Sequence, residues 1–139
     1  MASVKVTDRI AASTDRVWDL VRDFGGIGRW AAAVESVTLE GEGVGAVRTI
    51  GLPGGLKLQE RLEAIDERTR TLSYSIVGSH PLPFGEYLST IRLAEDGDGC
   101  QVDWSSTFEP RAGAETQAAG MVEGIYRGGI AGLKKALGA

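Results

Sequence analysis

The sequence predicts an α+β fold in which a curved, seven-stranded antiparallel sheet wraps around one long C-terminal helix. Three observations favour this fold: a strand pattern at 4–10, consecutive strand patterns from 34 to 108 with no helical pattern between them, and an amphipathic stretch at 114–137. Strands joined by short turns pair antiparallel, and apolar sheet and helix faces are buried most economically against each other. A chain of 139 residues fits a single domain spanning 1–139.

Two short helices are expected after the first strand. Ser13 is a candidate N-cap, and apolar residues recur at helical spacing from Val17 to Phe24. Three glycines at 25–28 then break the pattern. A second helical turn is therefore predicted at 29–33.

The middle of the chain predicts six strands separated by turn residues. They are expected at 34–40, 45–51, 57–66, 71–78, 84–94 and 99–108. The turn Asp96-Gly97-Asp98-Gly99 between the last two is typical of a hairpin, since a calcium loop would need further oxygen ligands and a terminal Glu. No repeat or linker divides this region, so the strands form one meander.

Composition and charge exclude several classes of function. The 15 basic and 19 acidic residues give a net charge of −4 without a long run of either sign, which argues against a nucleic-acid partner. No apolar stretch reaches the roughly 18 residues of a membrane span. One histidine and one cysteine exclude an intramolecular disulfide and a multi-ligand zinc site, so no metal and no other cofactor is expected. We expect a cytoplasmic protein with no obligate protein partner, and a homodimer is compatible with the sequence.

On several predicted strands, polar residues share the phase of the apolar ones. Residues two apart in a strand share a face, so Glu60, in phase with Leu58 and Leu62, is expected to point inward. A buried carboxylate needs a cation or a raised pKa, and Arg48 on the preceding strand is the nearest candidate cation. The same criterion predicts that the side chains of Tyr74, Tyr87, Ser89 and Trp104 also point inward. The pair is either a purely structural ion pair or part of a site, and so many inward polar groups favour a site.

The long helix and two loops indicate where a cavity and its mouth would lie. Ile125 and Gly129 fall on the predicted inward face of the helix, where small side chains either leave space or allow close packing against the sheet. Two loops are candidates to cover the mouth: 51–55 with Leu52 and Pro53, and 78–84 with His80 and Leu82. Prolines restrict the second loop, so His80 is either held over the mouth or simply exposed.

Four segments, in sequence order, resemble the START-like, or Bet v 1-like, superfamily. They are Val17-Trp18, Phe24 to Trp30, Glu60-Arg61-Leu62 running to Asp66, and Tyr126-Arg127 to Leu133. The nearest branch is the polyketide cyclase/dehydrase group, also called SRPBCC. The resemblance covers nearly the whole chain and implies a helix-grip fold around a hydrophobic cavity.

Two groups within this superfamily imply roles for individual residues. Lachrymatory factor synthase resembles the chain at Arg48, Glu60 and Tyr87, which implies a catalytic set. Abscisic-acid receptors resemble it in a gate loop at 51–54 and a latch loop at 78–82. Ala31 stands where those receptors use a lysine for the ligand carboxylate, which implies a ligand other than abscisic acid.

Two functions are compatible with these residues. In the first, the protein is a cofactor-independent lyase, isomerase or cyclase in which Glu60 transfers a proton, Arg48 holds an oxygen anion and Tyr87 orients the substrate. In the second, it is a non-catalytic carrier or sensor, and the same groups only orient a small hydrophobic or lipid ligand. In both, ligand contacts are expected from Tyr74, Ser89, His80, Trp104, Leu52, Pro53, Leu82, Ile125 and Gly129.

Overall fold

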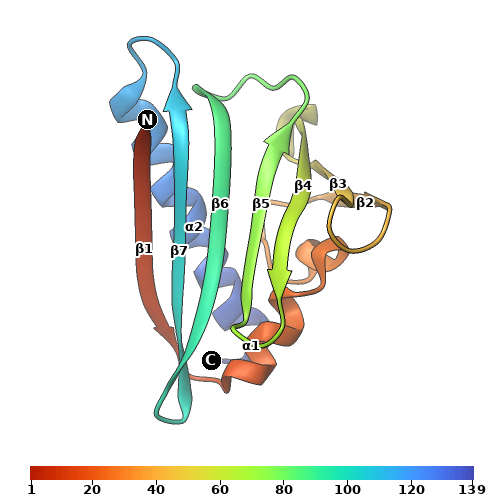
Figure 1. Ribbon diagram of the computed structural model, residues 1–139, viewed down its shortest axis with the longest axis vertical. Helices are drawn as coiled ribbons and strands as arrows, with labels where there is room; N and C mark the ends of the chain where they lie inside the picture. Colours follow the sequence, from red (N-terminus) through yellow and green to blue (C-terminus); the bar gives the residue numbers. More distant parts are fainter.

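The computed structural model describes residues Met1–Ala139, and its single sheet has seven antiparallel strands, as the sequence predicts. The elements in chain order are β1 (Ala2–Ile10), α1 (Thr14–Val21), η1 (Phe24–Arg29), β2 (Ser36–Glu40), β3 (Val47–Gly51), η2 (Pro53–Gly55), β4 (Lys57–Asp66), β5 (Thr71–Val77), β6 (Phe84–Asp96), β7 (Gly99–Pro110) and α2 (Glu115–Leu137). The strands lie in the order β1-β7-β6-β5-β4-β3-β2 (Figure 1). The meander from β2 to β7 is therefore extended at its far edge by β1.

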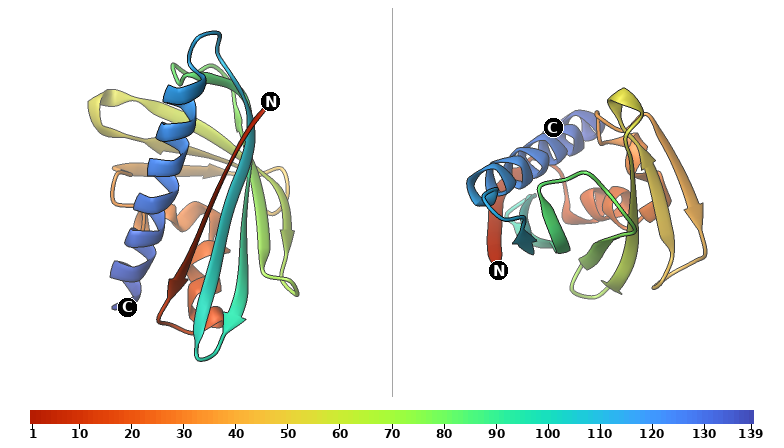
Figure 2. Two further views of the ribbon diagram at one scale, coloured as in Figure 1. Left: turned by 90° about the vertical axis from the view of Figure 1, so that its left-hand side faces the viewer. Right: turned by 90° about the horizontal axis from the view of Figure 1, so that it is seen from above.

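The sheet is curved, and α2 and the short helices lie on its concave side (Figure 2). Two irregularities interrupt the strand register, one between Leu62 and Ala64 on β4 and one between Phe84 and Tyr87 on β6. Such bulges bend a strand and increase its twist. The resulting arrangement is the helix-grip fold, with α2 held inside the bend of the sheet.

The second helix begins earlier than the glycines suggest. The sequence predicts a turn at 29–33, whereas the structure has a 3-10 helix at Phe24–Arg29 that contains all three glycines. Phe24 and Ile27 are buried and anchor this turn, and the amide of Gly26 donates to the carbonyl of Asp23 at 2.9 Å. Side-chain burial outweighs the low helix propensity of glycine here, because a short 3-10 turn relies on its anchors rather than on propagation.

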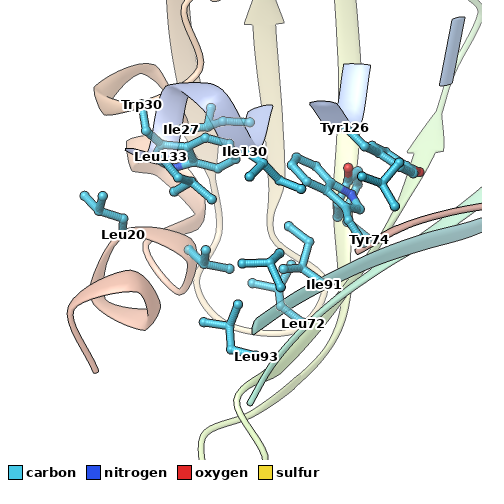
Figure 3. Packing of buried hydrophobic residues seen from close by; sticks show 14 of the residues in the cluster. Leu20, Ile27, Trp30, Leu72, Tyr74, Ile91, Leu93, Tyr126, Ile130 and Leu133 are labelled. Atoms are coloured by element: carbon cyan, nitrogen blue, oxygen red, sulfur yellow. The ribbon is translucent and has the colours of Figure 1, made fainter. Parts of the chain in front are cut away.

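The buried face of α2 includes Gly129, as predicted, but not Ile125. Ala118, Val122, Tyr126 and Ile130, spaced four residues apart, are all buried, whereas Ile125 is 47% exposed. Residues four apart lie above one another on a helix, so this row belongs to the buried face and Ile125 lies at its edge. Figure 3 shows Ile130 and Leu133 of α2 packed in the hydrophobic core with other buried side chains. None of the helices combines the length and apolar character that a membrane crossing requires.

Two glycines allow α2 to approach its neighbours closely. A Cβ atom on Gly129 would lie 2.5 Å from the Trp104 ring, and one on Gly132 would lie 1.9 Å from the carbonyl oxygen of Trp30. The Trp30 contact is with backbone, which cannot swing away as a side chain can. These glycines serve close packing, one of the two alternatives left by the sequence.

Exchanging single glycines of α2 for alanine tests whether Gly132 is required for the close approach of the helix. Gly132→Ala is expected to lower the free energy of unfolding by about 1–3 kcal/mol, because the added methyl group overlaps the Trp30 backbone. Gly120→Ala is the matched control: its Cβ meets nothing within 4 Å, so it should raise stability by about 0.5–1 kcal/mol through helix propensity. Urea denaturation followed by circular dichroism measures both. Equal changes in stability for the two variants would contradict the close approach of α2 to the Trp30 backbone.

Candidate functional site

A cavity of about 550 Å³ lies between α2 and the concave face of the sheet, bounded in part by the segment that follows η1. Of its 21 lining residues, 17 are hydrophobic, and Glu60 is the only charged one. The predicted site residues that line it are Leu52, Glu60, Tyr74, Leu82, Tyr87, Trp104, Ile125 and Gly129. Arg48, Pro53, His80 and Ser89 are absent from its wall. The volume falls within the range of small-molecule sites.

Glu60 and Arg48 form a buried ion pair at the back of the cavity. They lie directly opposite each other on β4 and β3, so that their side chains share the inner face. The Nε and Nη2 atoms of Arg48 lie 2.8 and 2.7 Å from the same oxygen, Oε1, of Glu60. The side chains of both residues are at least nine-tenths buried. The inward phase of the two strands is therefore confirmed.

The remaining contacts of Arg48 turn its guanidinium away from the cavity. Its Nη1 donates to the carbonyl oxygen of Phe24 at 3.1 Å. The guanidinium carbon lies 3.9 Å from the Phe24 ring centre and 5.1 Å from that of Tyr74, within the range of cation–π contacts. Glu60 differs, because its second oxygen, Oε2, has no hydrogen-bond partner and is not enclosed. The pair thus offers one free carboxylate oxygen to the cavity and no free cation.

A hydroxyl cluster fastens α2 to the sheet beside this pair. Trp104 Nε1 donates to Ser89 Oγ at 2.9 Å, and Ser89 Oγ lies 2.9 Å from the hydroxyl of Tyr126. The Tyr126 hydroxyl is also hydrogen-bonded to that of Tyr87. The rings of Trp104 and Tyr126 stack, with centroids 4.6 Å apart. Ser89 therefore lies behind the cavity wall and acts through Tyr126 and Trp104.

Sequence reasoning missed Tyr126 as a residue of the site. The predicted inward face includes Ile125, which lies at the cavity rim, but not Tyr126, which is fully buried and completes the hydroxyl cluster. The four-residue spacing from Val122 through Tyr126 to Ile130 was the available signal. Of the cavity wall between η1 and β2, the resemblance implies only Ala31; residues 32–34 were missed, because a run of small apolar residues carries no distinctive signal.

The two proposed mouth loops contribute unequally. Leu52 and Leu82 line the cavity, whereas Pro53 is exposed and outside its wall. His80 packs its ring against Phe84, with centroids 5.8 Å apart, and its Nδ1 accepts from the amide of Leu82 at 3.2 Å. Partial burial and the nearby Arg111 lower the pKa of His80. The histidine therefore braces its own loop and does not face the cavity.

No group of three or more His, Cys, Asp and Glu side chains is placed to hold a metal ion. The polar groups at the wall are a carboxylate and phenols. This donor set can hydrogen-bond a ligand or exchange a proton with it.

The three tyrosines of the chain should titrate together with unfolding. Burial raises the pKa of Tyr74, Tyr87 and Tyr126 above the ordinary value of 10.0. The native state then keeps protons that the unfolded chain loses, so stability falls as the pH rises above about 10. Phenolate absorbance should appear only as circular dichroism is lost, and it should follow ordinary titration in urea. Phenolate formation near pH 10 in the folded protein would contradict the burial.

Comparison with known proteins agrees with the fold. A solved structure of a protein from Bacillus thuringiensis is 34% identical with a TM-score of 0.89, over 97% of this chain and 98% of that one. Norcoclaurine synthase from Thalictrum flavum, solved with dopamine and hydroxybenzaldehyde, is 19% identical with a TM-score of 0.76, over 98% of this chain and 86% of that one. At that identity the likeness shows the fold alone.

Sequence comparison gives a relative and a family. The abscisic acid receptor PYL2 of Arabidopsis thaliana is 38% identical over 78 residues, which are 52% of this chain and 41% of the receptor. The chain thus matches less than half of that relative's length. Residues 1–138 match the family described as polyketide cyclase / dehydrase and lipid transport. The chain therefore belongs to this family, within the Bet v 1-like superfamily.

Proposed function

We propose that the protein binds a small, mainly apolar molecule in the cavity and that Glu60 exchanges a proton with it, in a cofactor-independent lyase, isomerase or cyclase reaction. The observation that carries the proposal is a single carboxylate with one free oxygen in an otherwise uncharged, largely apolar wall. The free oxygen of Glu60 has no other partner, so Glu60 would act as the general base. The reaction would take place in the cytoplasm.

Arg48 takes a different role from the one expected of it. Its Nε and Nη2 are bound to Glu60 and its Nη1 to the Phe24 carbonyl, so it positions Glu60 rather than holding an oxygen anion of the substrate. Tyr74 and Tyr87 line the cavity and orient the substrate by hydrogen bonds. Both remain uncharged phenols, because burial raises their pKa.

The second candidate function is a carrier or sensor of a hydrophobic molecule. The observation that favours it is the absence of a free cation in the cavity wall, since many proton-transfer reactions create an oxygen anion that needs a positive partner or several donors. In that case the polar groups only orient the ligand.

Filling the cavity mouth tests binding itself. Gly128 lines the cavity and a Cβ there meets nothing within 4 Å, so Gly128→Leu places its side chain in open space. The variant is expected to bind the apolar dye N-phenylnaphthylamine at least about tenfold more weakly, a loss of roughly 1.4 kcal/mol, because the leucine occupies ligand volume. Gly120→Leu, outside the cavity on the same helix, should bind like the wild type in a fluorescence titration. Unchanged affinity of Gly128→Leu would argue against this cavity as the site.

Replacing the carboxylate distinguishes catalysis from carriage. Wild type and Glu60→Gln are incubated with a metabolite extract, and bound and released compounds are identified by mass spectrometry. Glu60→Gln should retain a compound that the wild type converts, with turnover reduced about 10²-fold or more through loss of the base. Glu63→Gln, on the outer face of the same strand, is the matched control. A compound returned unchanged by the wild type and by both variants favours a carrier. Full turnover by Glu60→Gln excludes Glu60 as the general base.

A further inference from the structure

We propose, on the basis of the cavity binding proposed above, that the cavity selects its ligand by charge. It takes an apolar molecule whose polar head is an uncharged or cationic hydrogen-bond donor, an alcohol or a protonated amine. It excludes the carboxylic acid of the same size. The proposal rests on the charge of the cavity wall and on the hydrogen-bonding atoms of the wall that have no partner in the protein.

The only charge in the cavity wall is negative. Among the 21 lining residues there is no Lys, Arg or His, and Glu60 is the only one with a carboxylate. Arg48, the nearest cation, does not line the cavity, and its Nε and Nη2 lie on Glu60 and its Nη1 on the Phe24 carbonyl. A carboxylate entering the cavity would lose its water without gaining a cation, and it would lie near the Glu60 carboxylate. An anionic head is therefore rejected.

The hydrogen-bonding atoms that face the cavity are mainly acceptors. Glu60 offers its free Oε2. Ser89 has a single hydroxyl proton, which it donates to the carbonyl oxygen of Ser105 at 3.2 Å. Ser89 must then accept from Tyr126, and Tyr126 in turn from Tyr87. The proton of Tyr87 is thus directed toward α2, and its oxygen is left to accept from the ligand.

The remaining polar atoms do not reverse this preference. The Tyr74 hydroxyl can donate or accept and so adapts to either kind of ligand. The indole N–H of Trp30 has no partner, but it is enclosed by protein atoms and offers no surface to a ligand. A ligand that only accepts would leave both acceptors, Glu60 and Tyr87, unpaired in an apolar cavity, whereas a donor satisfies them.

Aromatic side chains around the carboxylate are suited to a protonated amine in particular. Trp30, Tyr74, Phe84, Tyr87 and Trp104 all line the cavity together with Glu60. The face of an aromatic ring attracts a cation, and the attraction is strongest where water is excluded. Rings of this kind add to the preference for an ammonium group without attracting an anion.

The test uses three probes that share one apolar body: naphthylethylamine, naphthylethanol and naphthylacetate. Their affinities are measured by isothermal titration calorimetry at about pH 7, where the amine is protonated and the acid ionised. Naphthylacetate should bind at least about tenfold more weakly than the better of the other two. Tighter binding of the amine assigns the site to an ammonium head, and tighter binding of the alcohol assigns it to an uncharged one.

Variants connect the preference to the ion pair. Glu60→Gln leaves the Arg48 charge unpaired, so naphthylacetate should become the tightest of the three probes. If that variant fails to fold, the double variant Arg48→Met with Glu60→Leu removes both charges, and the three affinities should converge to within about threefold. Glu63→Gln bears its charge change on the outer face, beside Arg61 and Ser75, and should keep the wild-type order.

The outcomes separate this inference from cavity binding. Naphthylacetate that binds the wild type as tightly as the amine or the alcohol overturns selection by charge and leaves cavity binding intact. An unchanged order of affinities in the folded Glu60 variants overturns it as well. Failure of all three probes to bind counts against both the selection and the proposed binding site.

Discussion

The close approach of α2 to one side of the fold is the constraint on which the site depends. Gly129 lies against the Trp104 ring and Gly132 against the Trp30 backbone, and no larger side chain fits at either position without movement of its neighbour. Tyr126 then ties the helix to β6 through Ser89 and Tyr87, while its ring stacks on Trp104 of β7. Because the helix is fixed here and the sheet curves away from it, a cavity remains between α2 and β3 to β6. The cavity is thus a consequence of where the helix is held.

The Arg48–Glu60 pair gives this space its chemistry. A buried ion pair recovers the cost of removing two charges from water only with good geometry and further partners, so it is weak support for stability. Here all the extra partners belong to Arg48, which has the Phe24 carbonyl and two aromatic rings around it. Glu60 has only its Oε1 engaged. The arginine is satisfied by the protein, and the carboxylate keeps unused hydrogen-bonding capacity that a ligand can meet.

Much of the fold could be predicted because strand alternation and turn residues are local signals. The bounds of β4 agree with the predicted 57–66, and the inward phase of Glu60, Tyr74 and Trp104 follows from apolar neighbours two residues away. The second helix was misplaced because three glycines outweighed the buried anchors Phe24 and Ile27, whose burial depends on packing against the rest of the core.

The sequence by itself determined the order of the strands along the chain, the inward direction of Glu60 and Tyr74 on their strands, and the pairing of Arg48 with Glu60 across a hairpin. Only the tertiary structure decided which of these residues meet a ligand. His80 and Pro53 lie outside the cavity wall, Arg48 and Ser89 lie behind it, and Tyr126 joins the cluster from a helix far along the chain. The physical reason is that alternation fixes only the direction of a side chain. Its access to the cavity depends on long-range packing, which sets how the sheet curves and where the helix is held.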